Sequence, residues 1–341
     1  STPKPSSAAS DVYKRQENKV RKRMTVKEIA KLANVSPATV SNVLNHRNNV
    51  GKETRQRILE ICKENGYDIN KGKNKKPAED TNTILFNFSD YERNFYLKII
   101  HGISDYVYSR GYDLMICTNK SCEKFMDPAL TCGTIMLDMK CKNSTLIQKA
   151  NEGYPIVALD RIMDVPNIKS VVVNNYAPMA ELVQGLVDKG YRRFGYIAGI
   201  DTLDNQERYR ALKDVLQKNG ITFSRENYFL GDYYEKSGYQ SARLMLLSDN
   251  IPEVLVCAND NMAIGAMKAL RQEGLKIPDD IAVTGFDGTE MSELMGLTTV
   301  DIPDYERGYL AAQFLLQNIA GSCSFDTFKI AAKVHWRKTT R

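Results

Sequence analysis

Residues 25–67 read TVKEIAKLANVSPATVSNVLNHRNNVGKETRQRILEICKENGY and predict three short helices. The first helix is expected over residues 26–33, because four apolar residues recur there on one helical face: Val26, Ile29, Ala30 and Ala33. Thr25 stands directly before them, where a hydroxyl can cap the first turn. The stretch therefore opens with a capped amphipathic helix.

A second helix is expected after a turn at Asn34 and Val35. Ser36 is placed as its N-cap, and Pro37 at the first helical position gives up no useful donor. The apolar face of this helix consists of Val40, Val43 and Leu44. The opposite face carries small side chains at the same helical spacing: Ala38, Ser41, Asn42 and Asn45.

The third helix starts near Lys52, buries Ile58, Ile61 and Cys62, and ends at Gly66. The first two helices and their turn predict a helix-turn-helix. Small side chains let a helix approach base edges closely, and Ser and Asn can hydrogen-bond to them. The residues alone leave a three-helix module for protein contacts as the alternative.

The motif V-S-P-A-T-V-S-N-V-L-N over 35–45, with T-V-K-E-I-A-K-L-A before it and V-G-K-E-T-R-x-R-I after it, is specific. It resembles the headpiece of the lactose-repressor/galactose-repressor (LacI/GalR) family of bacterial transcription regulators. The resemblance implies a recognition helix in the major groove of an operator. It implies phosphate contacts by Thr25, Ser36 and Thr54. It places these residues at or near the bases: Pro37, Ala38, Thr39, Ser41, Asn42 and Asn45.

Asn42 departs from the family pattern, which typically has Arg after T-V-S. Arg reads guanine with two hydrogen bonds, whereas Asn pairs best with adenine. We therefore expect an operator that differs from the usual family sequence at that base.

Two flanking segments lack apolar periodicity. Residues 1–23 are rich in Ser, Pro, Lys and Arg and are expected to be disordered. Met24 would make a natural start, which leaves open whether this leader is native. The headpiece is expected over 24–69 and a linker over 70–82. The linker has lysines but no leucine for the minor-groove wedge that the family resemblance would imply.

Charge separates the front of the chain from the rest. Residues 1–76 hold 18 Lys and Arg against 7 Asp and Glu, a net charge of +11, and the remainder holds 29 against 34, a net charge of −5. A basic front on a mildly acidic body favours a polyanion-binding headpiece on a separate module. No run of residues is apolar enough for a membrane span or a secretory signal, so a cytoplasmic protein is expected.

Cysteine and histidine usage predicts neither a metal site nor a cofactor. None of the seven cysteines forms a Cys-x-x-Cys pair, and most lie in apolar runs, as buried thiols in a reducing compartment do. The three histidines, His46, His101 and His335, are widely separated.

From Thr83 onward, apolar strand-like runs alternate with helical segments, which favours parallel sheets covered by helices on both faces. About ten strands are too many for one open sheet, so two doubly wound subdomains are expected. The predicted fold is an all-α helix-turn-helix headpiece plus an α/β domain over 83–341. Ligands of such folds bind at the carboxyl ends of strands, between the halves.

The family resemblance continues through this part, as a periplasmic-binding-protein-like effector domain. The matching stretches include GYRRFGYIAG over 190–199 and CANDNMAIGAMKALRQEGLKIPDDIAVTGFDG over 257–288. The resemblance implies a cleft for a small molecule, lined by a set of polar and aromatic residues: Asp90, Phe95, Asp160, Arg161, Arg208, Tyr233 and Asp260. Asp160 and Asp260 have a structural alternative as helix caps, and Asp287 is expected at the edge of the cleft or in a structural role.

Together these features predict a homodimeric DNA-binding regulator, most often a repressor in this family, whose operator affinity is controlled by a sugar or related metabolite. Two headpieces on a pseudo-palindromic operator bury more DNA surface than one. Two alternatives stay open: an effector domain that docks a protein partner, and a solute-binding protein. No nucleophile elbow, phosphate loop or metal-ligand spacing predicts an enzyme.

Overall fold

The structure of the protein, a computed structural model, describes residues 25–44, 50–65, 81–89, 95–118, 122–248 and 250–341. The chain divides into two compact units, Ser1–Asp80 and Thr81–Arg341, and each unit is described by itself. The leader over 1–23, most of the linker over 70–82, Asn45 and Asp90 lie outside the described residues.

The first unit holds three helices, α2 (Val26–Leu32), α3 (Pro37–Leu44) and α4 (Lys52–Glu64), which confirms the three predicted helices. Their small core combines residues from all three helices and the turn: Ile29, Ala30, Ala33, Val40, Val43, Ile58 and Cys62. Ile61 is only partly buried, which corrects the prediction that it belongs to the buried face of α4. The predicted end at Gly66 lies outside the described residues.

Side chains cap the first two helices as expected. Thr25 forms a capping box with Glu28: the Glu28 amide donates to Thr25 Oγ1 at 3.3 Å, and the Thr25 amide donates to Glu28 Oε2 at 2.6 Å. At the start of α3, the Thr39 amide donates to Ser36 Oγ at 3.1 Å. These bonds fix where each helix starts, and so fix the turn between α2 and α3.

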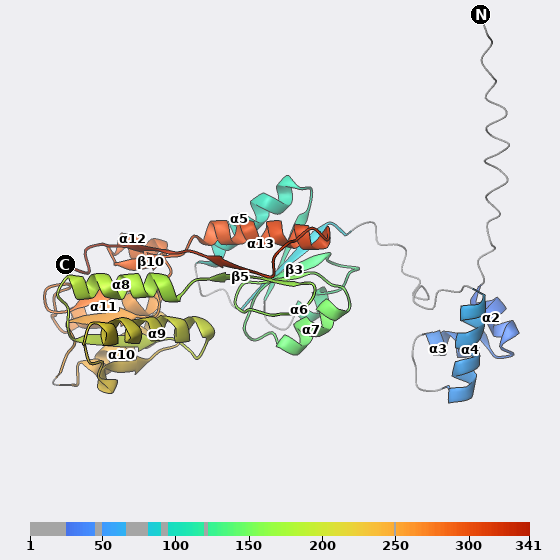
Figure 1. Ribbon diagram of the computed structural model, residues 1–341, viewed down its shortest axis with the longest axis horizontal. Coiled ribbons are helices and arrows are strands. Elements are labelled where there is room, and N and C mark those ends of the chain that lie inside the picture. Colours follow the sequence, from blue (N-terminus) through green and yellow to red (C-terminus); the bar gives the residue numbers. More distant parts are fainter. Residues whose placement is uncertain (1–24, 45–49, 66–80, 90–94, 119–121, 249) are drawn as a thin grey trace, which may run out of the picture. The chain divides into compact units, whose positions relative to one another are not determined.

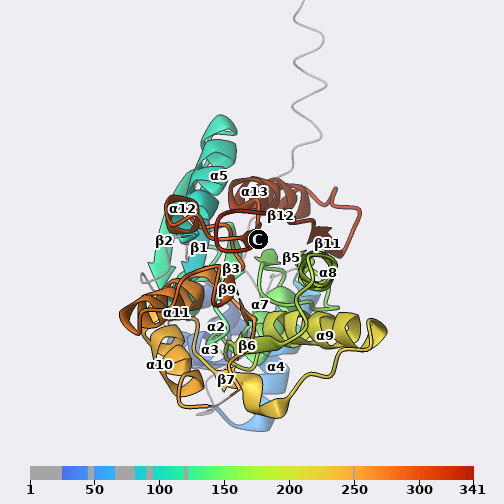
Figure 2. The same ribbon diagram turned by 90° about the vertical axis from the view of Figure 1, so that its left-hand side faces the viewer.

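The second unit contains two parallel sheets, which confirms the two doubly wound subdomains (Figures 1 and 2). The first sheet has the strand order β11-β5-β4-β3-β1-β2. Its strands are β1 (Thr83–Phe88), β2 (Asp113–Thr118), β3 (Gly133–Leu137), β4 (Ile156–Ala158), β5 (Ile168–Val173) and β11 (Thr327–Ile330). We call this sheet and its helices the first half: α5 (Tyr96–Ser109), α6 (Cys122–Phe125), α7 (Asn143–Asn151) and α13 (Asp304–Ile319).

Alternation along β1 explains the two faces of the first sheet. Ile84, Phe86 and Phe88 pack in the core beneath α5 and α13. Leu85 packs on the opposite face, in the core beneath α6 and α7. Because successive side chains of a strand point to opposite faces, one apolar strand supplies both cores.

The second sheet has the strand order β7-β6-β8-β9 and all its pairs are parallel. Its strands are β6 (Phe194–Ala198), β7 (Tyr228–Leu230), β8 (Val254–Cys257) and β9 (Ala282–Thr284). We call this sheet and its helices the second half: α8 (Tyr176–Asp188), α9 (Leu203–Lys218), η3 (Arg225–Asn227), α10 (Glu235–Met245), α11 (Asp260–Gln272) and α12 (Glu290–Leu294).

The chain passes between the halves three times. It leaves the first half after β5, returns between β10 (Thr299–Asp301) and α13, and crosses again between β11 and β12 (Lys333–His335). β10 and β12 pair antiparallel, with Thr299 opposite His335. Neither half is therefore one continuous segment, and the crossings pass close to the carboxyl ends of both sheets.

Helices α5 and α13 lie side by side on the first sheet and cross closely (Figure 1). A methyl group on Gly102 would overlap the carbonyl oxygen of Tyr305, and one on Gly308 would overlap that of Ile99. The contact thus needs glycine on both helices. Among the described residues, no helix combines the length and the apolar character that crossing a membrane requires.

Candidate functional site

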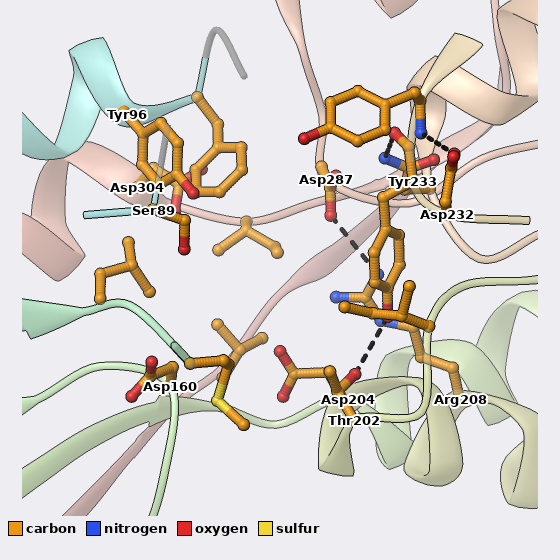
Figure 3. A pocket seen from close by; sticks show the side chains of 18 of the residues that line it. Ser89, Tyr96, Asp160, Thr202, Asp204, Arg208, Asp232, Tyr233, Asp287 and Asp304 are labelled. Carbon is orange, nitrogen blue, oxygen red and sulfur yellow. Dashed lines mark hydrogen bonds and ion pairs between the residues drawn. The ribbon is translucent and has the colours of Figure 1, made fainter. Parts of the chain in front are cut away.

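A cavity of about 320 Å³ lies between the two halves of the second unit (Figure 3). Most of its lining follows the carboxyl ends of strands in both sheets, where ligands of doubly wound folds bind. Among the residues that the structure describes, five carboxylates line it: Asp160, Asp204, Asp232, Asp287 and Asp304. Its cations are Lys140, Arg208 and Arg307, and its aromatic side chains are Phe95, Tyr96, Tyr233 and Tyr234.

Arg208 of α9 is buried and held on several sides. Its Nε donates to Asn175 Oδ1 at 2.8 Å, and its Nη1 donates to the Ala258 carbonyl and lies 3.5 Å from Asp287 Oδ1. The guanidinium also lies over the Phe286 ring. A planar cation fixed in this way presents hydrogen-bond donors to the cavity with little loss of side-chain entropy on binding.

Tyr233 follows β7 and adopts a left-handed backbone conformation, with φ of 72°. Its hydroxyl lies 3.2 Å from Thr202 Oγ1, and its ring lies against Gly199, where a methyl group would overlap it. Burial raises the pKa of the Tyr233 hydroxyl. Backbone strain of this kind persists where the surroundings hold it, commonly at ligand sites.

Asp160 follows β4 and reaches the cavity from the first half. Arg161 binds both of its carboxylate oxygens, with Nε to Oδ1 at 2.8 Å and Nη2 to Oδ2 at 2.9 Å. Burial raises the pKa of Asp160, and the Arg161 pair opposes that shift.

Arg161 itself does not belong to the cavity lining. Its remaining donors bind the Cys141 carbonyl at 2.8 Å, Asn143 Oδ1 at 2.7 Å and the Asp138 carbonyl. Arg161 therefore holds two features in place, the carboxylate of Asp160 and the turn after β3. Met139 and Lys140 of that turn line the cavity.

Asp260 also lies behind the cavity, fully buried at the start of α11. It accepts hydrogen bonds from the Thr289 amide at 2.8 Å, from the Thr289 hydroxyl at 3.0 Å and from the Thr299 hydroxyl. Burial raises its pKa to about 6. These bonds tie the start of α11 to β10 and to Thr289 before α12. The N-cap of α11 is Asn259 rather than Asp260, so the predicted alternative of Asp260 as a helix cap is wrong.

The sequence reasoning missed several cavity residues. Asp304 and Arg307, on the first turn of α13, form an ion pair at 3.4 Å, and burial raises the pKa of Asp304 to about 6. Asn259 lies two residues after the end of β8, and its Nδ2 donates to the Tyr233 carbonyl at 3.0 Å. The carboxyl-end rule could have identified Asn259, whereas the return of α13 to the first half has no local sequence signal.

In the first unit, the predicted DNA-contacting residues are mostly accessible. Thr25, Ser36, Pro37, Ala38 and Ser41 are exposed, and Thr39, Asn42 and Thr54 are half-buried. Among the residues that the structure describes, no group of His, Cys, Asp or Glu could hold a metal ion.

Two family models match the chain. One, described as bacterial regulatory proteins of the lacI family, matches residues 25–70. The other, described as a periplasmic binding protein-like domain, matches residues 183–340. A curated relative, the probable HTH-type transcriptional repressor ExuR of Bacillus subtilis, is 30% identical over 307 residues, covering 87% of this chain and 92% of the relative.

Solved structures are similar in both sequence and fold. A complex of the transcriptional regulator CelR with cellobiose has a TM-score of 0.69 and 25% identity, covering 93% of this chain and 100% of that chain. The lac repressor dimer bound to operator and the anti-inducer ONPF has a TM-score of 0.69 and 25% identity, covering 94% and 99%.

Proposed function

The chain belongs to the lacI family of bacterial regulatory proteins and is a DNA-binding transcriptional repressor controlled by a small-molecule effector; on that premise, we propose which residues carry each activity. The headpiece over 24–69 binds DNA, the linker over 70–82 joins it to the rest, and 83–341 binds the effector and dimerises. The chain works as a cytoplasmic homodimer and is not an enzyme.

The proposed effector is a neutral polyhydroxylated molecule such as a saccharide. The observation that carries this proposal is the described part of the cavity lining, in which carboxylates outnumber cations and aromatic rings lie beside them. Carboxylates accept hydrogen bonds from hydroxyls, while aromatic faces cover the apolar face of a sugar ring. The likeness to the cellobiose complex of CelR supports the same ligand class.

The proposed contacts come from both halves. Asp160 and Phe95 act from the first half, and Arg208, Tyr233 and Asp287 from the second. A ligand that bonds to both walls binds a closed arrangement of the halves more tightly than an open one. Only such a difference in ligand affinity between two arrangements can change the affinity for the operator. Arg161 and Asp260 act by positioning, because their donors and acceptors are engaged behind the cavity.

The proposed DNA contacts lie on α3 and at helix starts. Ala38, Ser41 and Asn42 share the face opposite the apolar stripe, and Thr39 and Pro37 open the same helix. Asn45 continues that face in sequence. Thr25 and Ser36, at the N-caps, and Thr54, in the first turn of α4, bind phosphates, since helix starts offer amides and a favourable dipole to anions.

A gel shift on the DNA upstream of the protein's own gene tests the proposal. We expect a sequence-specific shift that changes when the cognate saccharide is added. A thermal-shift screen of sugars, nucleosides and phosphorylated sugars identifies that ligand first. If only a protein partner stabilises the second unit, the small-molecule assignment to the cavity is wrong, and if no specific shift occurs, the operator assignment is wrong.

A further inference from the structure

Two cysteines of the first half lie side by side, and one of them belongs to the turn that carries Met139 and Lys140 of the cavity lining. The sulfur atoms of Cys122, at the start of α6, and Cys141, in the turn between β3 and α7, are 3.7 Å apart. Both thiols are buried, with 2% and 7% of the residue exposed. A disulfide bond needs about 2.0 Å between the sulfur atoms, so a small local movement would join them.

We propose that Cys122 and Cys141 are a reversible dithiol pair that a hydroperoxide oxidises to a disulfide, and that this bond alters the wall of the effector cavity. The Cys122 thiolate attacks one oxygen of the peroxide, the O–O bond breaks and a sulfenic acid forms. The departing oxygen takes up the proton that the thiol gave up and leaves as water when the oxidant is hydrogen peroxide, or as an alcohol from an organic hydroperoxide. The Cys141 thiol then attacks that sulfur, the S–O bond breaks, and the thiol proton passes to the departing hydroxide, which leaves as water. Two thiols are oxidised and one peroxide is reduced, and a thiol reductant restores the pair.

The surroundings favour Cys122 as the attacking thiol. The hydrogen bond between the Cys122 and Cys141 thiols and a bond from the Glu123 amide lower the pKa of Cys122, against burial and the nearby Asp138. The thiolate is the reactive form of cysteine. By contrast, burial raises the pKa of Cys117 to about 12 and that of Cys132 to about 11, so these thiols stay protonated.

The link to the cavity runs through the turn that carries Cys141. The Cys141 amide donates to the Asp138 carbonyl at 3.1 Å, which closes the turn over Met139 and Lys140, two residues of the cavity lining. The Cys141 carbonyl accepts from Arg161, whose other donors hold Asp160. Drawing Cys141 toward Cys122 therefore moves a turn that lines the cavity and strains the arginine that positions Asp160.

The test starts with the full-length protein, treated with hydrogen peroxide, quenched with catalase and alkylated under denaturing conditions. We expect peptide mapping by mass spectrometry to find one Cys122–Cys141 linkage, the loss of two of the seven titratable thiols, and full recovery with dithiothreitol. Retention of all seven thiols, or a linkage of Cys122 to Cys117, overturns the proposal. This measurement needs no variant to fold.

The effect on the cavity has its own readout. Oxidation should change hydrogen exchange by severalfold in peptides covering 138–143 and 160–161. Cys122→Ser and Cys141→Ser should abolish that change, whereas Cys323→Ser, at a half-exposed thiol far along the chain, should leave it intact. A disulfide without any change in exchange would refute the link to the cavity. Neither readout uses ligand or DNA, so failure here is distinct from failure of the proposed function, on which the regulatory meaning of the switch rests.

Discussion

The guanidinium carbon of Arg208 lies 3.7 Å from the centre of the Phe286 ring. This stacking, together with the bonds to Asn175 and Ala258, fixes the orientation of a buried cation at the edge of the cavity. A lysine keeps the charge but loses the planar fork and the stacking.

We therefore expect Arg208→Lys to weaken effector binding by about tenfold or more, through loss of charge-assisted hydrogen bonds. The measurement is the effector concentration that produces half of the maximal change in operator binding. Arg210→Lys is the matched control, because Arg210 is exposed on the same helix and lies over Tyr176, away from the cavity lining. Equal responses of the two variants would contradict a role of Arg208 in binding.

Asp160→Asn should lower stability even without ligand. The change keeps the volume but leaves the buried Arg161 without its carboxylate partner. Removing one member of a buried pair costs about 3 kcal/mol, which corresponds to a melting temperature lower by roughly 5–10 °C. Differential scanning calorimetry measures this, with Asp164→Asn as the exposed control. A melting temperature within a degree of the wild type would show that Arg161 finds another partner.

The second unit should become more stable as pH falls from 7 toward 5. Burial raises the pKa of Asp260 and of Asp304 to about 6, above the value of about 4 for an unfolded aspartate. Between these values the folded state binds more protons than the unfolded state, so stability rises as pH falls through 6.

Asp260→Asn removes one of these two titrating groups. Its melting temperature should therefore depend less on pH over the range from 7 to 5 than that of the wild type, as thermal unfolding in matched buffers will show. Asp279→Asn, on an exposed loop of the same half, should keep the wild-type dependence. The same pH slope in all three proteins would mean that Asp260 stays ionised throughout.

Asn42→Arg should change which base is preferred at one position of each operator half-site, from adenine to guanine. Selection from random DNA measures the preference. Gln56→Arg adds the same charge on the exposed side of α4 and should raise affinity without changing preference, since added charge acts through phosphates. An unchanged preference for Asn42→Arg would remove Asn42 from the base-reading set.

Local signals in the sequence predicted most elements of the fold. Thr25 marked the start of α2, and Ser36 and Pro37 marked the start of α3. A continuous apolar run such as TILFNF is typical of a strand that is buried on both faces, and it predicted β1. These features depend on neighbours in the chain and are therefore visible without the structure.

The cavity was only partly predictable, because its lining depends on long-range topology. Asp160, Arg208 and Tyr233 were named from motifs, and the structure places them on the cavity. Arg161 was named from the same motif, yet the structure turns its guanidinium toward the turn after β3. Asp304 reaches the cavity only because α13 returns to the first sheet, and no spacing within the sequence encodes that return.

The three crossings also set an order for biosynthesis. The first sheet is completed by β11 (Thr327–Ile330), at the far end of the chain, whereas all four strands of the second sheet end by Thr284. A ribosome therefore delivers the whole second sheet while the edge of the first still lacks its last strand and the cover of α13. During translation, the first half is begun first but completed last. Its apolar Val171 and Val173 remain without their strand partners, Phe328 and Ile330, which are synthesised 157 residues later.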